Sequence, residues 1–220
     1  MTLDKHRLPD LMALANLLHS LLSIYPEKAS IDEFKANELA LCWPKLDHSA
    51  KEQQALDALH HFLDNWRGTE QQLIELKLDF GELFYGPHTP KAPPWGSVYT
   101  GPSQLLNDQS TLELSAFLRQ HGIEVHQQSN EPLDHIATIL AVISYLLESL
   151  AQPGSSDTTH KILTELLETH LLPWSGRFTE LAAEHAKTDF YRSVSLLCEI
   201  YLLYLSGAVH AEAKPVSLYL

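Results

Sequence analysis

Two carboxyl groups and an imidazole stand close together in the segment Asn130-Glu131-Pro132-Leu133-Asp134-His135. Such groups can transfer protons or bind a cation. Catalytic proton transfer also needs a nucleophile or a metal, and the sequence contains no GxSxG motif, no HExxH motif and no Cys/His cluster. Neighbouring helical residues point about 100° apart, so Asp134 and His135 are poorly placed to act on one atom. The segment therefore favours binding, and a helical-bundle hydrolase with these two residues as acid and base is the alternative.

The place of this segment at the start of a helix gives Asp134 a second possible role. Pro132 is predicted to be the first residue of a helix over 132–151, because proline is tolerated where the amide would be unpaired. A carboxylate in the opening turn is stabilised by the helix dipole and accepts bonds from free amides, so Asp134 could simply cap the helix. The helix itself is apolar on almost every side. Polar groups at the mouth of such a buried helix tend to face a cleft.

A second candidate site is the stretch of aromatic residues and prolines from Phe80 to Tyr99. Prolines stiffen the backbone there, while Gly86 and Gly96 permit close approach of another chain. A preorganised apolar groove loses little entropy when it binds an extended or helical peptide. Packing of the aromatics into the bundle is the alternative. The predicted peptide-binding residues of this stretch are Leu83, Phe84, Tyr85, His88, Pro93, Pro94, Trp95, Gly96, Ser97 and Tyr99.

A third segment, His170-Leu171-Leu172-Pro173-Trp174-Ser175-Gly176-Arg177-Phe178, is interpreted as the end of one helix and the start of the next at Pro173. Trp174 and Phe178 then lie one turn apart on the new helix. For this pair, packing is favoured over recognition.

These segments are positioned by a chain with helical spacing of apolar residues and almost no alternating strand pattern. The sequence predicts an all-α fold, a single-domain bundle of about eight or nine helices over residues 1–220. The predicted helices are 9–26, 31–43, 49–66, one through Leu73 and Phe84, 102–121, 132–151, 157–170, 173–186 and 189–210. Residues 86–102 hold five of the twelve prolines, which predicts one long proline-rich loop without regular structure. A hinge is predicted near 152–159.

Composition excludes several classes of protein. Lys and Arg number 15 against 28 Asp and Glu, a formal net charge of −13, which argues against a nucleic-acid surface. Two cysteines are too few for a disulfide framework or a zinc site, so no metal and no cofactor are expected. The start of the chain does not read as a secretory signal. The apolar stretch 136–147 is too short to span a bilayer, so the sequence predicts a cytoplasmic protein without stable membrane insertion.

The three segments together resemble those of the twin-arginine redox-enzyme maturation chaperones, the family that contains the trimethylamine-oxide and dimethyl-sulfoxide reductase chaperones. Glu131-Pro132-Leu133-Asp134-His135 is similar to the family's E-P-x-D-H signature. The LFYGP and PPWGSVY pieces resemble its proline-rich loop, and HLLPW followed by Phe178 resembles its third block. The combination of PPWGSVY with NEPLDH is similar above all to the dimethyl-sulfoxide reductase branch. Ala137 and His88 depart from the family pattern, which commonly has glycine and an aromatic residue there.

The resemblance implies a function without catalysis. It implies a chaperone that binds the twin-arginine leader of a molybdoenzyme catalytic subunit until cofactor insertion is complete. The Tat translocase and cofactor-insertion proteins are implied as further partners, and the chain is expected to be a monomer or a domain-swapped dimer. A helical adaptor that binds the folded partner enzyme is an alternative. The predicted peptide-binding set is completed by Glu131, Pro132, Asp134 and His135.

A twin-arginine leader carries a basic segment followed by an apolar one, so its receptor should offer carboxylates beside an apolar groove. Asp134 or Glu131 could take a guanidinium in a bidentate pair. A helix dipole at Pro132 would, however, disfavour an arriving cation. In the alternative that follows from this, Asp134 organises the loop and another acid binds the arginines.

Overall fold

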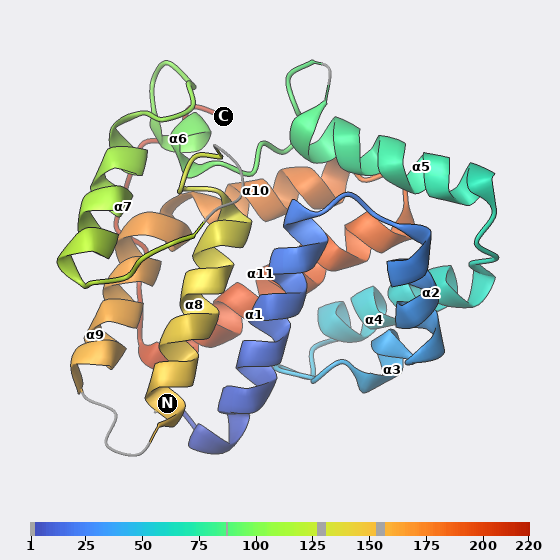
Figure 1. Cartoon of the computed structure of the whole chain (residues 1–220), viewed down its shortest axis with the longest axis horizontal. Coiled ribbons are helices and arrows are strands. Elements are labelled where there is room, and N and C mark those ends of the chain that lie inside the picture. Colours follow the sequence, from blue (N-terminus) through green and yellow to red (C-terminus); the bar gives the residue numbers. More distant parts are fainter. Residues whose placement is uncertain (1–2, 87, 127–130, 153–156) are drawn as a thin grey trace. The chain divides into compact units, whose positions relative to one another are not determined.

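The computed structural model describes all residues except 1–2, 87, 127–130 and 153–156. It is all-α, as predicted, and the described residues form no strand. Its elements are η1 (Lys5–Arg7), α1 (Leu8–Ser23), α2 (Lys28–Ala36), α3 (Leu39–Cys42), α4 (Ala50–Asn65), α5 (Glu70–Phe80), η2 (Gly81–Tyr85), α6 (Gly96–Thr100), α7 (Gln109–Gln120), α8 (Ile136–Ala151), α9 (Asp157–Glu165), η3 (Leu166–Leu171), α10 (Leu172–His185) and α11 (Asp189–Val209) (Figure 1). Parts of three predicted features, namely Pro87 of the loop, Asn130, and 153–156 of the hinge, lie outside the described residues.

The chain forms two compact units that are interleaved in the sequence. Unit 1 comprises residues 1–22, 94–177 and 202–220, and unit 2 comprises 23–93 and 178–201. Helix α11 therefore begins in unit 2 and ends in unit 1. The single domain expected over 1–220 stays a prediction.

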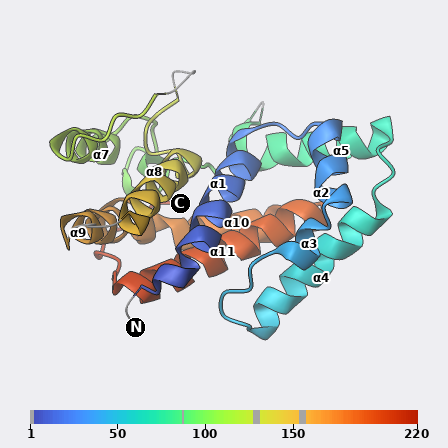
Figure 2. The same ribbon diagram turned by 60° about the horizontal axis from the view of Figure 1, so that its bottom comes forward.

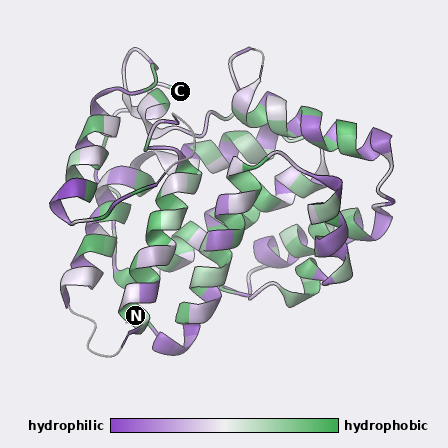
Figure 3. Cartoon of the chain, viewed as in Figure 1, coloured by the Kyte–Doolittle hydropathy of each residue, from purple (hydrophilic) through white to green (hydrophobic). Residues whose placement is uncertain are grey.

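The core of unit 1 is built around α8, which lies beside α1 (Figures 1 and 2). Burying apolar faces supplies most of the stability of such helices. Apolar residues line much of α8 (Figure 3), and they include the fully buried Leu140, Ile143 and Leu147. The imidazole of His19 on α1 donates from Nδ1 to the carbonyl oxygen of Ala137 at 2.8 Å. This bond ties α1 to the first turn of α8, where the candidate residues of unit 1 begin.

The core of unit 2 includes a buried carboxylate that fixes the start of α11. Asp79 accepts hydrogen bonds from the backbone amides of Lys187 (3.0 Å) and Thr188 (2.8 Å). It also accepts one from the Thr188 hydroxyl at 2.6 Å. Because a buried acceptor left unpaired is costly, these bonds hold the end of α5 against the beginning of α11. Helix α5 leads directly into the candidate stretch from Phe80 to Tyr99.

Several helix boundaries in the first half follow the sequence signals. Helix α1 ends before Pro26. The side chain of Ser49 caps α4 by accepting a bond from the amide of Glu52, and the side chain of Thr69 caps α5 by accepting one from the amide of Gln72. The predicted helix 31–43 is instead two helices, α2 and α3. Glu38 adopts a left-handed conformation with φ of 50°, which interrupts the helical ladder between them.

Two proline-based boundaries are wrong. The predicted helix 102–121 begins only at Gln109, and 132–151 only at Ile136. The predicted start at Pro173 lies one residue after the start of α10 at Leu172, and α9, the π-helical turn η3 and α10 follow one another without a gap. The proline-rich loop also contains a regular element, since 96–100 form the short helix α6.

Helix α11 is long and apolar enough to cross a membrane by length and composition. Of its most apolar window, 61% is buried within the protein. Burial to this extent is typical of a helix that passes through a protein core.

Candidate functional site

In unit 1, the start of α6 and the start of α8 are joined by an antiparallel backbone bridge between Trp95 and His135. The amide of Ile136 donates to the carbonyl oxygen of Pro94 at 2.8 Å, and the amide of Gly96 donates to that of Asp134 at 3.1 Å. Backbone groups of residues 134–136 therefore form hydrogen bonds with residues 94–96, which are distant in the sequence. This is why the helix starts four residues after Pro132 and the E-P-x-D-H segment is not helical.

Asp134 serves the neighbouring helix α6. Its Oδ2 accepts a hydrogen bond from the backbone amide of Ser97 at 2.6 Å. Only 3% of Asp134 is exposed, and its other oxygen has no hydrogen-bond partner among the described residues. The prediction that Asp134 lies in the opening turn of its own helix is thus wrong. It supplies an acceptor to the first turn of α6, whose N-cap residue Trp95 makes no side-chain cap bond.

His135 is the residue that caps α8. Its Nδ1 accepts a bond from the amide of Ala137 at 3.1 Å, so the ring proton of the neutral imidazole lies on Nε2. Burial, with a further contribution from His19, lowers the pKa of His135 to about 3. The imidazole is therefore neutral near pH 7, and a cationic role for His135 is excluded.

Trp95 and Glu131 form the outer edge of this arrangement. The indole nitrogen of Trp95 donates to Oε2 of Glu131 at 3.1 Å, and the Trp95 ring meets the His135 ring edge-on at 5.5 Å. Trp95 is 8% exposed and Glu131 is half-buried. Both acids of the predicted site, Glu131 and Asp134, thus already bind groups of the loop that carries Trp95.

The third sequence segment packs under α6. The Trp174 ring stacks on the Tyr99 ring at 5.5 Å, and a Cβ added to Gly96 would lie only 2.6 Å from the indole nitrogen. That nitrogen donates to the carbonyl oxygen of His170 at 2.8 Å, within the turn η3. Burial raises the pKa of Tyr99 well above its usual value. Gly96 is therefore the residue that allows α6 to approach Trp174 closely.

Leu83, Phe84 and Tyr85 of the LFYGP piece lie in unit 2, in the π-helical turn η2. Leu83 and Phe84 are buried, and Phe84 contacts the rings of Phe80, Phe178 and Tyr191. Tyr85 is half-buried, His88 is exposed and Pro93 is buried. Leu83 and Phe84 thus pack into the core, as the alternative for these aromatics expected.

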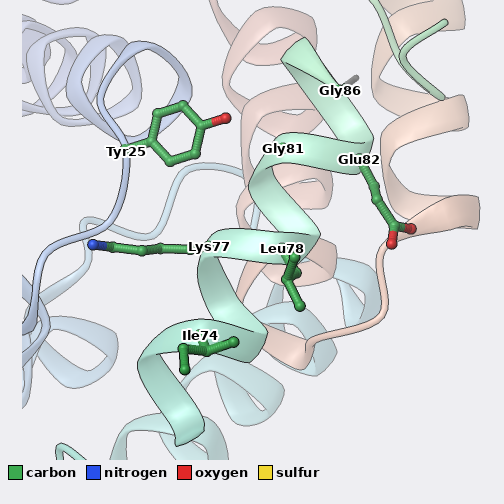
Figure 4. A pocket seen from close by; sticks show the side chains of 7 residues that line it. All are labelled: Tyr25, Ile74, Lys77, Leu78, Gly81, Glu82 and Gly86. Carbon is green, nitrogen blue, oxygen red and sulfur yellow. The ribbon is translucent and has the colours of Figure 1, made fainter. Parts of the chain in front are cut away.

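A pocket of about 550 Å³ opens beside this turn and is lined mainly by apolar groups (Figure 4). Tyr25 forms one side of it, and Ile74 and Leu78 reach into it from α5. Tyr25 also contacts the Tyr85 ring at 6.2 Å. The lining residues are Tyr25, Ile74, Lys77, Leu78, Gly81, Glu82 and Gly86.

None of the pocket residues was a predicted binding residue. A signal was available, because Ile74 and Leu78 stand four residues apart and off the stripe formed by Leu76 and Phe80. Leu78 is 59% exposed and Ile74 is 43% exposed. A second apolar stripe on an otherwise polar helix marks a surface for contact with another molecule.

The structure therefore divides the predicted site residues between the two units. Unit 1 brings together Pro94, Trp95, Gly96, Ser97, Tyr99, Glu131, Pro132, Asp134 and His135. Unit 2 contains Leu83, Phe84, Tyr85, His88 and Pro93. In the described ranges, no group of three or more His, Cys, Asp or Glu side chains is arranged to hold a metal ion. What these residues offer is a hydrogen-bonded frame in unit 1 and an open apolar pocket in unit 2.

Comparisons with known proteins agree with the sequence resemblance. Residues 46–180 match the family model described as nitrate reductase delta subunit. The Tat proofreading chaperone DmsD of Salmonella typhimurium is 36% identical over 120 residues, which are 54% of this chain and 55% of that protein. The chain thus spans about half the length of the Salmonella relatives that it matches.

Other relatives align over more of the chain. The probable Tat proofreading chaperone DmsD of Haemophilus influenzae is 33% identical over 153 residues, 70% of each protein. The chaperone protein TorD of Aliivibrio fischeri is 29% identical over 188 residues, 84% of this chain and 87% of that protein. These relatives are described as chaperones and not as enzymes. The chain is therefore a member of the nitrate reductase delta subunit family and of the DmsD- and TorD-like chaperones.

Proposed function

We propose that this protein is a cytoplasmic chaperone that binds the twin-arginine leader of a molybdenum-cofactor oxidoreductase precursor, of the dimethyl-sulfoxide or trimethylamine-oxide reductase type. It holds the leader until the precursor is ready for export. The names of the relatives support this role, since they include Tat proofreading chaperones. The same proposal takes the Tat translocase and cofactor-insertion proteins as later partners.

The observation that carries the proposal is the frame around α6. Three segments that are distant in the sequence meet there, through the bridge between Trp95 and His135 and the stack of Tyr99 on Trp174. Buried groups hold one another in place, with Asp134 bound to the amide of Ser97. A preorganised frame of this kind reduces the entropy lost on binding a flexible peptide. The hydroxyl of Ser97 in this frame has no hydrogen-bond partner among the described residues, so it is not activated by a base, which suits binding better than catalysis.

The predicted residues take different roles in this proposal. In unit 1, the buried Asp134 and His135 position the frame; in unit 2, the buried Phe84 positions the turn η2; and the partly exposed members contact the leader. The apolar pocket beside Tyr85 offers a place for the apolar segment of the leader, because Ile74 and Leu78 are otherwise exposed to water.

Charge supports a cationic ligand. The formal net charge of −13 attracts a basic leader over long range and makes the association faster at low salt. Both predicted acids already bind groups of the loop. This favours the alternative in which Asp134 organises the loop and another acid meets the arginines.

The test is a calorimetric titration of the full chain with a synthetic twin-arginine leader, together with a version in which both arginines are glutamine. The proposal predicts binding of the first peptide and at least tenfold weaker binding of the second, since one lost charge-assisted bond changes affinity by about that factor. If neither peptide binds while the mature partner enzyme does, the protein is an adaptor for the folded enzyme and the proposal is refuted.

A pair of matched variants tests the pocket. Leu78→Asp places a charge in it, while Leu41→Asp makes the same change on α3, where Leu41 is 62% exposed and Leu78 is 59% exposed. We expect only Leu78→Asp to weaken leader binding. Equal affinities for both variants would show that the apolar segment binds elsewhere.

A further inference from the structure

Residues 211–220, here called the strap, follow α11 as an extended segment across unit 1. The amide of Lys214 donates to the carbonyl oxygen of Glu168 in η3 at 2.9 Å, and the amide of Tyr219 donates to that of Tyr99 in α6 at 2.9 Å. Figure 1 shows the end of the chain beside α6. The strap thus connects two elements that belong to the segments carrying the family resemblance.

Further hydrogen bonds hold the strap by its main chain. The amide of Glu212 donates to the carboxylate of Glu168 at 3.3 Å. The side-chain amide of Gln104 donates to the carbonyl oxygen of Tyr219, and the guanidinium of Arg177 donates to that of the following residue at 3.4 Å. Main-chain pairing of an extended segment is the way in which proteins commonly bind a peptide of another chain.

The side chains of the strap contribute little to this attachment. All residues from 212 to 219 are exposed, and they include Val216, Leu218 and Tyr219, which are 46%, 43% and 46% exposed. Since apolar burial is the main source of stability, a segment held chiefly by surface hydrogen bonds opens at a low free-energy cost. The strap is therefore suited to leave its place without unfolding the helices.

The strap also has the order of residues expected of a leader. Lys214 comes first, and Val216, Leu218 and Tyr219 follow, which repeats a basic group followed by an apolar stretch. Carboxylates lie near this part of the strap, because the carboxylate of Glu168 accepts a bond from the Glu212 amide, and the charges of Glu113 and Glu165 act on the imidazole of His170.

The charges around His170 show this arrangement. Burial lowers the pKa of His170. The negative charges of Glu113 and Glu165 raise this pKa, and the positive charge of Lys214 lowers it further. These charges therefore act on one imidazole, at the η3 end of the strap. Glu113, Glu165 and Glu168 thus supply carboxylates near this end of the strap, whereas both acids of the E-P-x-D-H segment are bound to the loop.

Beneath the other end of the strap lies Tyr99. It is fully buried, and its hydroxyl has no hydrogen-bond partner among the residues that the structure describes. A buried hydroxyl left unpaired is costly. The strap pairs with the backbone carbonyl of Tyr99, and the buried hydroxyl of that residue stays without a partner in the described structure.

We propose that the strap is an internal substitute for the leader: it occupies the surface between η3 and α6, and the leader binds there only after displacing it. This inference rests on the proposed function and deepens it by naming the surface. The leader's arginines take the place of Lys214 near Glu165 and Glu168, and the residues next to the arginines pair with the carbonyl oxygen of Tyr99 as the strap does. Closure of the strap lowers the apparent affinity by the fraction of molecules in which the surface is free.

The first experiment compares two proline substitutions in the full chain. Tyr219→Pro removes the amide that donates to Tyr99. Ser217→Pro is the matched control, because the Ser217 amide makes no backbone hydrogen bond within the described part of the chain. Calorimetric titration with the leader should show affinity raised about threefold to tenfold in Tyr219→Pro, as expected for one net hydrogen bond, and unchanged in Ser217→Pro.

The second experiment measures displacement directly. On leader binding to the full chain, hydrogen exchange at the amides of Lys214 and Tyr219 should accelerate. A chain ending at residue 210 that keeps its helical circular dichroism should bind the leader at least tenfold more tightly, and a peptide of residues 211–220 added to it should compete with the leader.

The outcomes separate the two proposals. Leader binding with equal affinity in all forms, and with no change in exchange at Tyr219, refutes the strap and leaves the proposed function in place. Weaker leader binding by Tyr219→Pro and by the shortened chain also refutes the strap, since it would then form part of the binding surface. Failure of the leader to bind any form refutes the proposed function, and with it the strap.

Discussion

Replacement of Asp134 distinguishes a positioning residue from a residue that touches the leader. Asp134→Ala removes the acceptor of a 2.6 Å bond from the Ser97 amide, and both residues are buried. A hydrogen bond to a charged group contributes about 1.5–3 kcal/mol, and a buried donor left unpaired costs about 1–3 kcal/mol. These are partly the same effect, so we expect a loss of about 3 kcal/mol. For a chain of this length, that lowers Tm by about 6–12 °C.

Two further variants calibrate this result. Asp134→Asn keeps an oxygen for the Ser97 amide but adds a donor where the second oxygen has no partner in the described structure, so it should fall between wild type and Asp134→Ala. Glu131→Ala removes a bond to the Trp95 indole at a half-buried site, and about 1 kcal/mol or less is expected. Urea unfolding followed by circular dichroism gives the stabilities. If Asp134→Ala is as stable as wild type while leader binding is lost, Asp134 contacts the leader and our assignment is wrong.

Three other predictions concern Gly96, His135 and the net charge. Gly96→Ala brings a Cβ within 2.6 Å of the Trp174 indole nitrogen, whereas a Cβ at Gly207 meets nothing within 4 Å, so Gly96→Ala should lower stability by about 1–3 kcal/mol and Gly207→Ala should raise it slightly in thermal melts. The pKa of His135 is lowered to about 3 in the folded protein. Its contribution to the free energy of unfolding is therefore complete above the pKa of the unfolded chain, near 6.5, and is lost as the pH falls toward 3. His135→Asn keeps a capping side chain but does not titrate, so urea unfolding should show a flatter pH dependence from pH 6 to 4; an identical pH dependence would contradict the assignment. Leader affinity should fall as salt rises from low to physiological concentration, and salt-independent calorimetric affinity would contradict the role given to the net charge of −13.

Local patterns predicted the helices whose ends depend on nearby residues. Helix α4 starts where Ser49 can accept a bond from the Glu52 amide, and α1 ends before Pro26. The start of α8 could not be predicted in this way. The backbone of Asp134 and Ile136 is hydrogen-bonded to Gly96 and Pro94, which are far away in the sequence. A tertiary contact of this kind overrides the preference of Pro132 for a helix start.

The short helix α6 shows the same limit at the candidate site. Its residues carry two glycines at or just after its ends and follow a pair of prolines, a composition that predicts a loop. The helix forms because Asp134 supplies the acceptor at its first turn and Trp174 supplies the surface beneath it. Sequence analysis expected Trp95 and Asp134 to lie close together, and their segments are joined by backbone hydrogen bonds in unit 1. It could not show that the two acids were already bound within the loop.

The two π-helical turns explain why helical spacing did not reveal how the family segments are arranged. One is η2, which holds Leu83 and Phe84, and the other is η3, which ends at Leu171, two residues before Pro173. A π-helical turn inserts one extra residue, so every side chain after it is rotated relative to a regular helix. At η3 the amide of Leu172 donates to the carbonyl oxygen of Leu167, five residues earlier, and the indole nitrogen of Trp174 donates to the carbonyl oxygen of His170. The chain therefore stays helical through Pro173. Such turns are rare and are found frequently at functional sites, and here each one sets the side chains of a segment that carries the family resemblance.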